Sequence, residues 1–195
     1  MAAEVARVPQ DARLRQQYAS LLRTNKQLDA AAMEIAAAHT LSPNKQAIIF
    51  EQGVGAVQAG KFELGRQYFT QAYDLDHTNG DAAAYAAAGH ILTNDVSGGK
   101  ALLQARFGTT IVNQNIIIFA YYSIKDWNDL ILTLQQKKKE LNDATSGLQL
   151  AGAYYQAGRI ADAKAELQST VAAYPEAQAS AESLLAQMKA SPTKK

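Results

Sequence analysis

The sequence predicts an all-α fold: a right-handed α-solenoid of about five helical hairpins, followed by a C-terminal capping helix. The first observation is a repeat of 34 residues, visible where small residues recur at positions 31, 65 and 99. The second is that two further sets of positions keep this spacing. The three sets are Ala31, Gly65 and Gly99; Ala19, Gly53 and Ala87; and the large apolar Ile35, Phe69 and Leu103.

The spacing has a physical basis, because one helical hairpin cannot bury its apolar side by itself. Small residues let two helices approach closely, and large apolar residues fill the gaps between layers. We therefore expect one domain over residues 11–190, after a linker or leader at 1–10 and before a disordered tail at 191–195. The repeats are expected at about 12–45, 46–79, 80–110, 111–143 and 144–177, with the capping helix at 176–190.

The first three copies are each expected to form two helices joined by a tight turn. Gly60 can adopt the left-handed conformation that ends a first helix, and Pro43 prevents a second helix from continuing. His77 stands where other copies have this proline. The expected helices are 11–24 and 27–40, 44–58 and 62–75, and 79–93 and 97–107.

The fourth copy is expected to be irregular, since Gly99 and Ala163 are 64 residues apart, four short of two periods. Its first helix should therefore be shortened. In the fifth copy, Gly158 supplies the turn and Pro175 ends the second helix. The expected helices are 113–123 and 126–140, then 143–157 and 161–173, and a cap that presents Leu184, Leu185 and Met188 on one side.

Composition excludes several classes of function. With 19 Lys and Arg against 18 Asp and Glu, the formal charge is +1, so the chain lacks the basic excess of a general nucleic-acid binder. The absence of cysteine excludes disulfides and thiolate metal sites, but it leaves the compartment open. The longest strongly apolar run, 116–122, is far shorter than the roughly 20 residues of a membrane span.

No residue pattern indicates catalysis, a cofactor or a metal site. The three histidines, at positions 39, 77 and 90, lack the spacing that would place two ligands on one helix face. The stretch Ser97–Lys100 (SGGK) has letters of a phosphate loop but not its glycine spacing, and we interpret it as the start of a helix. Lys137, Lys138 and Lys139 are interpreted as a solvated helix surface. We therefore expect no enzyme.

The repeat columns resemble the tetratricopeptide-repeat (TPR) family over about residues 11–175. The match is most specific in the fifth copy, which has small, aromatic, turn-glycine, small, large and proline residues in the expected order. These are Ala151, Tyr154, Gly158, Ala163, Leu167 and Pro175. The resemblance implies a non-catalytic protein–protein interaction or assembly module.

A narrower resemblance concerns the segments DARLRQQYASLL and LSPNKQAIIFEQG together with the irregular fourth copy. They are similar to the soluble repeat domain that follows the membrane region of bacterial O-antigen ligase-like polysaccharide proteins. This implies an extracytoplasmic arm of a membrane-anchored protein that does not itself insert into the membrane; without the resemblance, a cytoplasmic location is expected. No catalytic residue carries over.

In tetratricopeptide proteins the first helices line a concave groove, so the resemblance implies that a protein or peptide partner binds there. The corresponding positions combine aromatic, aliphatic and polar side chains, which favours a hydrophobic or aromatic-anchored peptide. They are Arg13, Gln16, Arg23, Phe50, Val54, Val57, Ile91, Phe119, Tyr122, Tyr155 and Gln156. The alternatives are a helical-repeat RNA-binding protein, which the charge disfavours, and a purely structural spacer.

Overall fold

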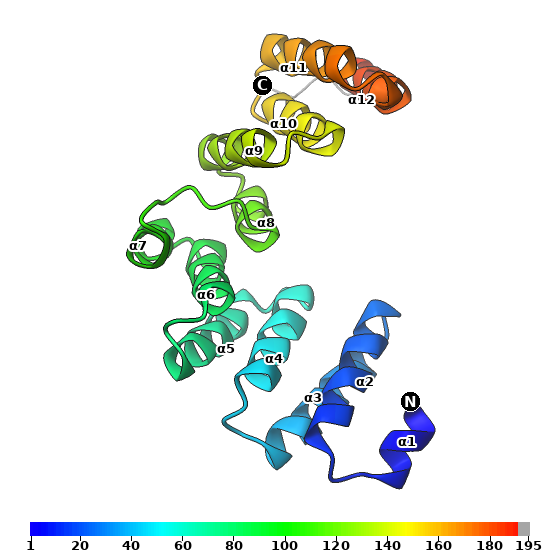
Figure 1. Ribbon diagram of the computed structural model, residues 1–195, viewed down its shortest axis with the longest axis vertical. Helices are drawn as coiled ribbons and strands as arrows, with labels where there is room; N and C mark the ends of the chain where they lie inside the picture. Colours follow the sequence, from blue (N-terminus) through cyan, green and yellow to red (C-terminus); the bar gives the residue numbers. More distant parts are fainter. Residues whose placement is uncertain (191–195) are drawn as a thin grey trace. The chain divides into compact units, whose positions relative to one another are not determined.

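The computed structural model describes residues 1–190, and the described part of the chain folds into helices without strands (Figure 1). Each of the ten predicted repeat helices is present within a few residues of its predicted ends. The helices are α1 (Ala2–Arg7), α2 (Ala12–Thr24), α3 (Leu28–Leu41), α4 (Gln46–Gln58), α5 (Phe62–Leu75), α6 (Gly80–Leu92), α7 (Val96–Phe107), α8 (Asn115–Ser123), α9 (Trp127–Leu141), α10 (Ala144–Gln156), α11 (Ile160–Ala173), the 3₁₀ helix η1 (Pro175–Ala177) and α12 (Gln178–Ala190). The tail predicted at 191–195 lies outside the described residues.

The N-terminal segment differs from the predicted linker. Residues 2–7 form α1, which contacts α2, and Val5 is 6% exposed. Six residues are too few to show a helical periodicity in the sequence, and this is why the pattern did not reveal the helix.

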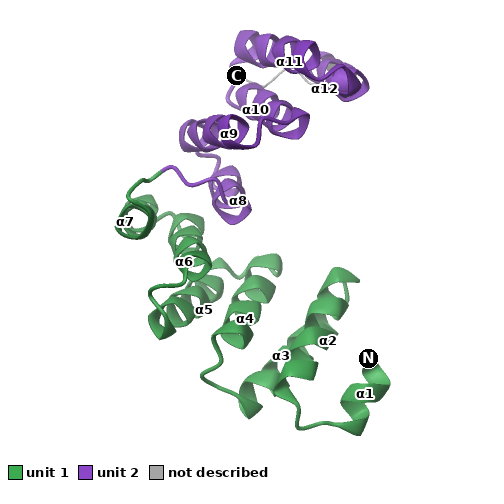
Figure 2. Ribbon diagram, viewed as in Figure 1, with its two compact units in different colours: residues 1–110 green, residues 111–195 purple. Residues whose placement is uncertain are grey.

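The chain divides into two compact units, Met1–Thr110 and Ile111–Lys195 (Figure 2). Their boundary coincides with the predicted junction between the third and fourth repeats. The single domain predicted over residues 11–190 stays a prediction.

Unit 1 contains three hairpins, α2–α3, α4–α5 and α6–α7, and their cores use the predicted columns. Phe69 and Leu103 are fully buried, and Ile35 is 7% exposed. Gly65 lies at a close helix contact, because a Cβ placed on it would be 2.6 Å from Cγ2 of Val57. The 34-residue spacing therefore corresponds to equivalent packing positions.

Unit 2 contains the hairpins α8–α9 and α10–α11, followed by η1 and α12. The predicted shortening of the first helix is confirmed, since α8 has 9 residues. Leu134 and Leu167 are almost fully buried, as is Ala163. On α12, Met188 is buried and contributes to the cover of the last layer.

All five hairpin turns share one geometry. The residue at the turn is left-handed in each, with φ between 60° and 75°, at Lys26, Gly60, Asn94, Lys125 and Gly158. The backbone N–H of the next residue donates a hydrogen bond of 2.9 Å to the carbonyl five residues before it. The five bonds join Gln27 to Leu22, Lys61 to Ala56, Asp95 to His90, Asp126 to Tyr121 and Arg159 to Tyr154. This bond satisfies a carbonyl at the end of the first helix. In the sequence, a glycine marks two of these turns, at Gly60 and Gly158. The left-handed residues of the other three turns are not glycines.

The left-handed lysine at position 125 predicts a stabilising substitution. Lys125→Gly is expected to raise the free energy of unfolding by about 1 kcal/mol, because a left-handed conformation with a Cβ costs roughly 1–2 kcal/mol and glycine avoids most of that cost. Asn94→Gly should gain less, since asparagine tolerates this conformation better. Urea denaturation followed by circular dichroism measures both; a loss of stability in Lys125→Gly would contradict the assignment of this turn.

Candidate partner-binding surface

The predicted groove residues of unit 1 differ in exposure. Arg13 is exposed, whereas Gln16 and Val54 are partly exposed. Val57 and Ile91 are buried, at 7% and 0% exposure. The last two positions cannot present their side chains to a partner, so their prediction as groove residues is corrected.

Val57 and Ile91 are buried for the same reason. Each lies over the small residue of the second helix of its hairpin: Cγ2 of Val57 over Gly65, and Cγ1 of Ile91 over Gly99, 2.6 and 2.7 Å from where a Cβ would stand. The branched side chain fills the space that the glycine leaves open. These residues therefore hold the two helices together.

Arg23 also has a structural role on this surface. Its Nη2 lies 3.1 Å from Oε2 of Glu51, an ion pair that links α2 to α4. Both side chains are about four-fifths buried, with 22% and 18% exposure. Arg23 was predicted as a polar groove residue, and the structure shows that its guanidinium is already engaged with the neighbouring hairpin.

Phe50 belongs to an aromatic cluster formed with Phe69 and Tyr85. Its ring centroid lies 4.2 Å from that of Tyr85 and 5.8 Å from that of Phe69, and Phe69 and Tyr85 are 5.1 Å apart. Tilted and edge-on contacts of this kind stabilise aromatic pairs beyond the area they bury. Burial, together with the charges of Asp81 and Glu51, raises the pKa of the Tyr85 hydroxyl. Phe50 therefore joins the first-helix surface to the core of unit 1.

In unit 2, the first-helix surface exposes two large aromatic side chains on α8. Phe119 is 42% exposed and Tyr122 is 53% exposed. Three residues apart, they lie on the same helix face. The Tyr122 ring meets Trp127 edge-on at a centroid distance of 5.7 Å. Of the other predicted positions, Tyr155 is partly exposed and Gln156 is exposed on α10.

A cleft of about 270 Å³ opens between the first two hairpins, and the repeat pattern gave no prediction of it. Its lining is mainly apolar, with alanines and a glycine among the larger side chains, and it includes four charged residues. The lining residues are Ala19 and Arg23 of α2; Leu28, Asp29, Ala31, Ala32, Ile35 and Ala36 of α3; Glu51, Gln52, Gly55 and Ala56 of α4; and Ala59, Lys61, Leu64 and Tyr68. A signal for it is present in α3, whose run of alanines leaves space against the next hairpin.

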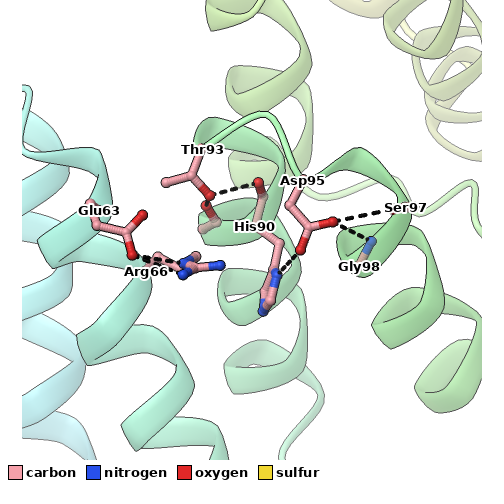
Figure 3. A network of polar contacts seen from close by, with 8 residues as sticks. Glu63, Arg66, His90, Thr93, Asp95, Ser97 and Gly98 are labelled. Atoms are coloured by element: carbon pink, nitrogen blue, oxygen red, sulfur yellow. Dashed lines mark hydrogen bonds and ion pairs between the residues drawn. The ribbon is translucent and has the colours of Figure 1, made fainter.

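The SGGK stretch lies at the start of α7, as predicted from the sequence, and it takes part in a polar network (Figure 3). Asp95 caps α7 by accepting from the backbone N–H of Gly98 at 2.9 Å, and its Oδ2 lies 2.7 Å from Nδ1 of His90. The bonds from His90 and from Gly98 hold the pKa of Asp95 below its ordinary value. Beside it, Arg66 pairs with Glu63 at 2.8 Å. The contact between Asp95 and His90 links the start of α7 to the end of α6, and Gly98 of the SGGK stretch takes part through the helix cap.

Neither a metal centre nor a membrane span is found in the described part of the chain. Within residues 1–190, no group of three or more His, Cys, Asp or Glu side chains is arranged to hold a metal ion. No helix in that range combines the length and apolar character needed to cross a membrane.

Comparison with known proteins identifies the fold. No family model and no curated protein matches the sequence. Among solved structures, a chain of the APC/C hetero-tetramer Cut9-Hcn1 aligns with a TM-score of 0.64 at 12% identity, over 88% of this chain and 35% of that one. This chain therefore spans about a third of that protein.

Two other structures match over most of both chains. MamA protein aligns with a TM-score of 0.56 at 12% identity, over 86% of this chain and 93% of that one. YrrB, described as a TPR protein with an unusual peptide-binding site, gives 0.53 at 14% identity, over 89% and 92%. At these identities the likeness establishes the fold alone, and the predicted all-α helical-repeat fold is confirmed.

Proposed function

We propose that this chain is a non-catalytic protein–protein interaction or assembly module that binds a peptide segment of its partner on the first-helix surface. The fold supports this proposal, since helical repeats present extended surfaces built from equivalent positions. The observation that carries it is the exposed pair Phe119 and Tyr122 on one face of α8.

The chemistry of this face suits a protein partner. Rigid aromatic side chains provide a large contact area and lose little conformational entropy on binding, which is why aromatic residues are frequent among the residues that dominate binding energy. The edge-on contact with Trp127 restrains Tyr122 before a partner arrives. The alternative of RNA binding has less support, because the net charge of +1 supplies no basic excess.

A selected peptide provides the test of this proposal. Random peptides displayed on phage are selected on the full chain, and their affinities are measured by calorimetry. The double substitution Phe119→Ala with Tyr122→Ala is expected to weaken binding about thirtyfold, corresponding to roughly 2 kcal/mol. The matched control is Leu132→Ala on α9, a second helix, because Leu132 is equally exposed at 43%.

A competing surface is the lysine run on α9. Lys138 is paired with Glu166 at 2.6 Å, and Lys137 donates to Asn115 at 3.1 Å. Binding through this run would be strongly salt-dependent. If peptide binding is lost only when these lysines are neutralised, the α8 proposal is wrong.

The narrower assignment, as the extracytoplasmic arm of a bacterial O-antigen ligase-like membrane protein, rests on the sequence resemblance. Its test is the reading frame upstream of Met1. Several apolar spans encoded there would support it, and their absence from the full gene would contradict it.

A further inference from the structure

The cleft between the first two hairpins lies where the repeat pattern changes. In the second and third hairpins, Val57 and Ile91 fill the space above a glycine of the paired helix. The equivalent position in the first hairpin, 34 residues before Val57, is occupied by Arg23. Arg23 reaches across to Glu51 instead of filling the space with apolar atoms, and it lines the cleft.

The interface between the first and second hairpins is open at a position where the interface between the second and third hairpins is closed. Between the second and third hairpins, a Cβ on Gly89 would lie 2.9 Å from Cα of Arg66. The equivalent pair between the first and second hairpins is Gly55 and Ala32, and a Cβ on Gly55 would meet no atom within 4 Å. The same position in the repeat is thus tightly packed in one interface and unoccupied in the other.

The size of the cleft matches one large side chain. A cavity of about 150 Å³ lined by apolar residues can bind benzene, whereas pockets for drug-sized molecules begin at about 300 Å³. At about 270 Å³, this cleft can take a phenyl or a branched aliphatic group, with limited room beyond it.

The charges at the cleft favour an uncharged occupant. Arg23 and Lys61 are balanced by Asp29 and Glu51, so the lining carries no net charge. A ligand that brought its own charge into the apolar part would lose hydration without a net opposite charge to compensate.

Two polar atoms of lining residues point to a polypeptide occupant. Nε of Arg23 and Oε1 of Gln52 are buried and have no hydrogen-bond partner. A buried donor or acceptor without a partner is costly, so a ligand that supplies both a carbonyl and an N–H is favoured. The main chain of a peptide supplies both groups. Because both atoms are closed off from solvent, binding requires the side chains of Arg23 and Gln52 to rotate toward the cleft.

We propose that this cleft binds one large apolar side chain of a protein partner, with the adjoining peptide main chain bonded to Arg23 and Gln52. This deepens the proposed function, on which it rests for the class of partner, and places a second contact in unit 1. It names residues different from those of the α8 face.

A defined peptide probe tests the cleft in the full chain. The probe is acetyl-Gly-Ser-Phe-Ser-Gly-amide, with a matched peptide that carries alanine in place of phenylalanine, and toluene as an apolar ligand without a main chain. Amide chemical shifts of the ¹⁵N-labelled chain are followed during titration. The phenylalanine peptide is expected to give saturable shifts at Ala32, Ala36, Gly55 and Ala59, and the alanine peptide is expected to give none.

Filling the cleft should remove these shifts. Gly55→Leu places a side chain in the open space and is expected to abolish saturation, and Ala32→Leu provides a second plug from the opposite wall. The matched control is Gly152→Leu, because a Cβ on Gly152 of α10 also meets no atom within 4 Å. This control is expected to bind the peptide normally, and thermal melting checks that every variant is folded.

The outcomes separate the two proposals. Absence of saturable shifts at the cleft, or their persistence in both plugged variants, overturns the cleft assignment. Saturation by toluene at least as tight as by the peptide overturns the role of the main chain. If phage-selected peptides bind normally after the Phe119 and Tyr122 substitutions, the α8 face is overturned while the cleft result stands.

Discussion

Phe69→Ala is expected to lower the free energy of unfolding of unit 1 by about 3–5 kcal/mol, the range found when a buried phenylalanine is truncated. Phe69 is fully buried, and its ring contacts those of Phe50 and Tyr85. Its ring also occupies the space beside Gly53, where a Cβ would clash with it. Truncation would therefore remove the residue that joins α5 to the helices on both sides.

Chemical denaturation measures this loss, and an exposed phenylalanine provides the control. Phe119→Ala should change the stability by less than about 1 kcal/mol, because the Phe119 side chain is 42% exposed and leaves no enclosed cavity. Equal losses in the two variants would show that the aromatic cluster does not form the core of unit 1.

Gly65→Leu is expected to cost roughly 1–3 kcal/mol, because added atoms in a packed interface force neighbouring side chains and helices to shift. The displaced residue would be Val57, whose Cγ2 lies 2.6 Å from the position of the new Cβ. The same substitution at Gly55, in the facing helix α4, meets open space and should not destabilise the chain.

Thermal melting distinguishes these two variants. A Gly65→Leu midpoint equal to that of the unmodified chain would mean that the 34-residue register does not mark the close helix contacts. A lower midpoint for Gly65→Leu alone would support both the register and the openness of the first interface.

The first-helix surface could be predicted only in part. The repeat places Val57 and Ile91 on first helices, but their burial depends on glycines in the paired helices, at Gly65 and Gly99. Phe50 is likewise drawn into a cluster by Tyr85, which is 35 residues away in the sequence. The exposure of a side chain at a repeat position depends on the residue that it packs against in the neighbouring helix. The alignment of equivalent repeat positions does not contain this information.

The helical hairpins, their order and their ends to within about two residues follow from the sequence, because a fixed period, turn glycines and stop prolines are local signals. The left-handed conformation of the turns without glycine, as at Lys125, is evident only in the structure, where hydrogen bonds at the helix end hold it. The structure also shows that the interface between the first and second hairpins is open at Gly55, whereas the interface between the second and third hairpins is closed at Gly89. Each glycine faces a residue of a different helix, Ala32 of α3 for Gly55 and Arg66 of α5 for Gly89. Close packing therefore depends on which residues meet across the interface.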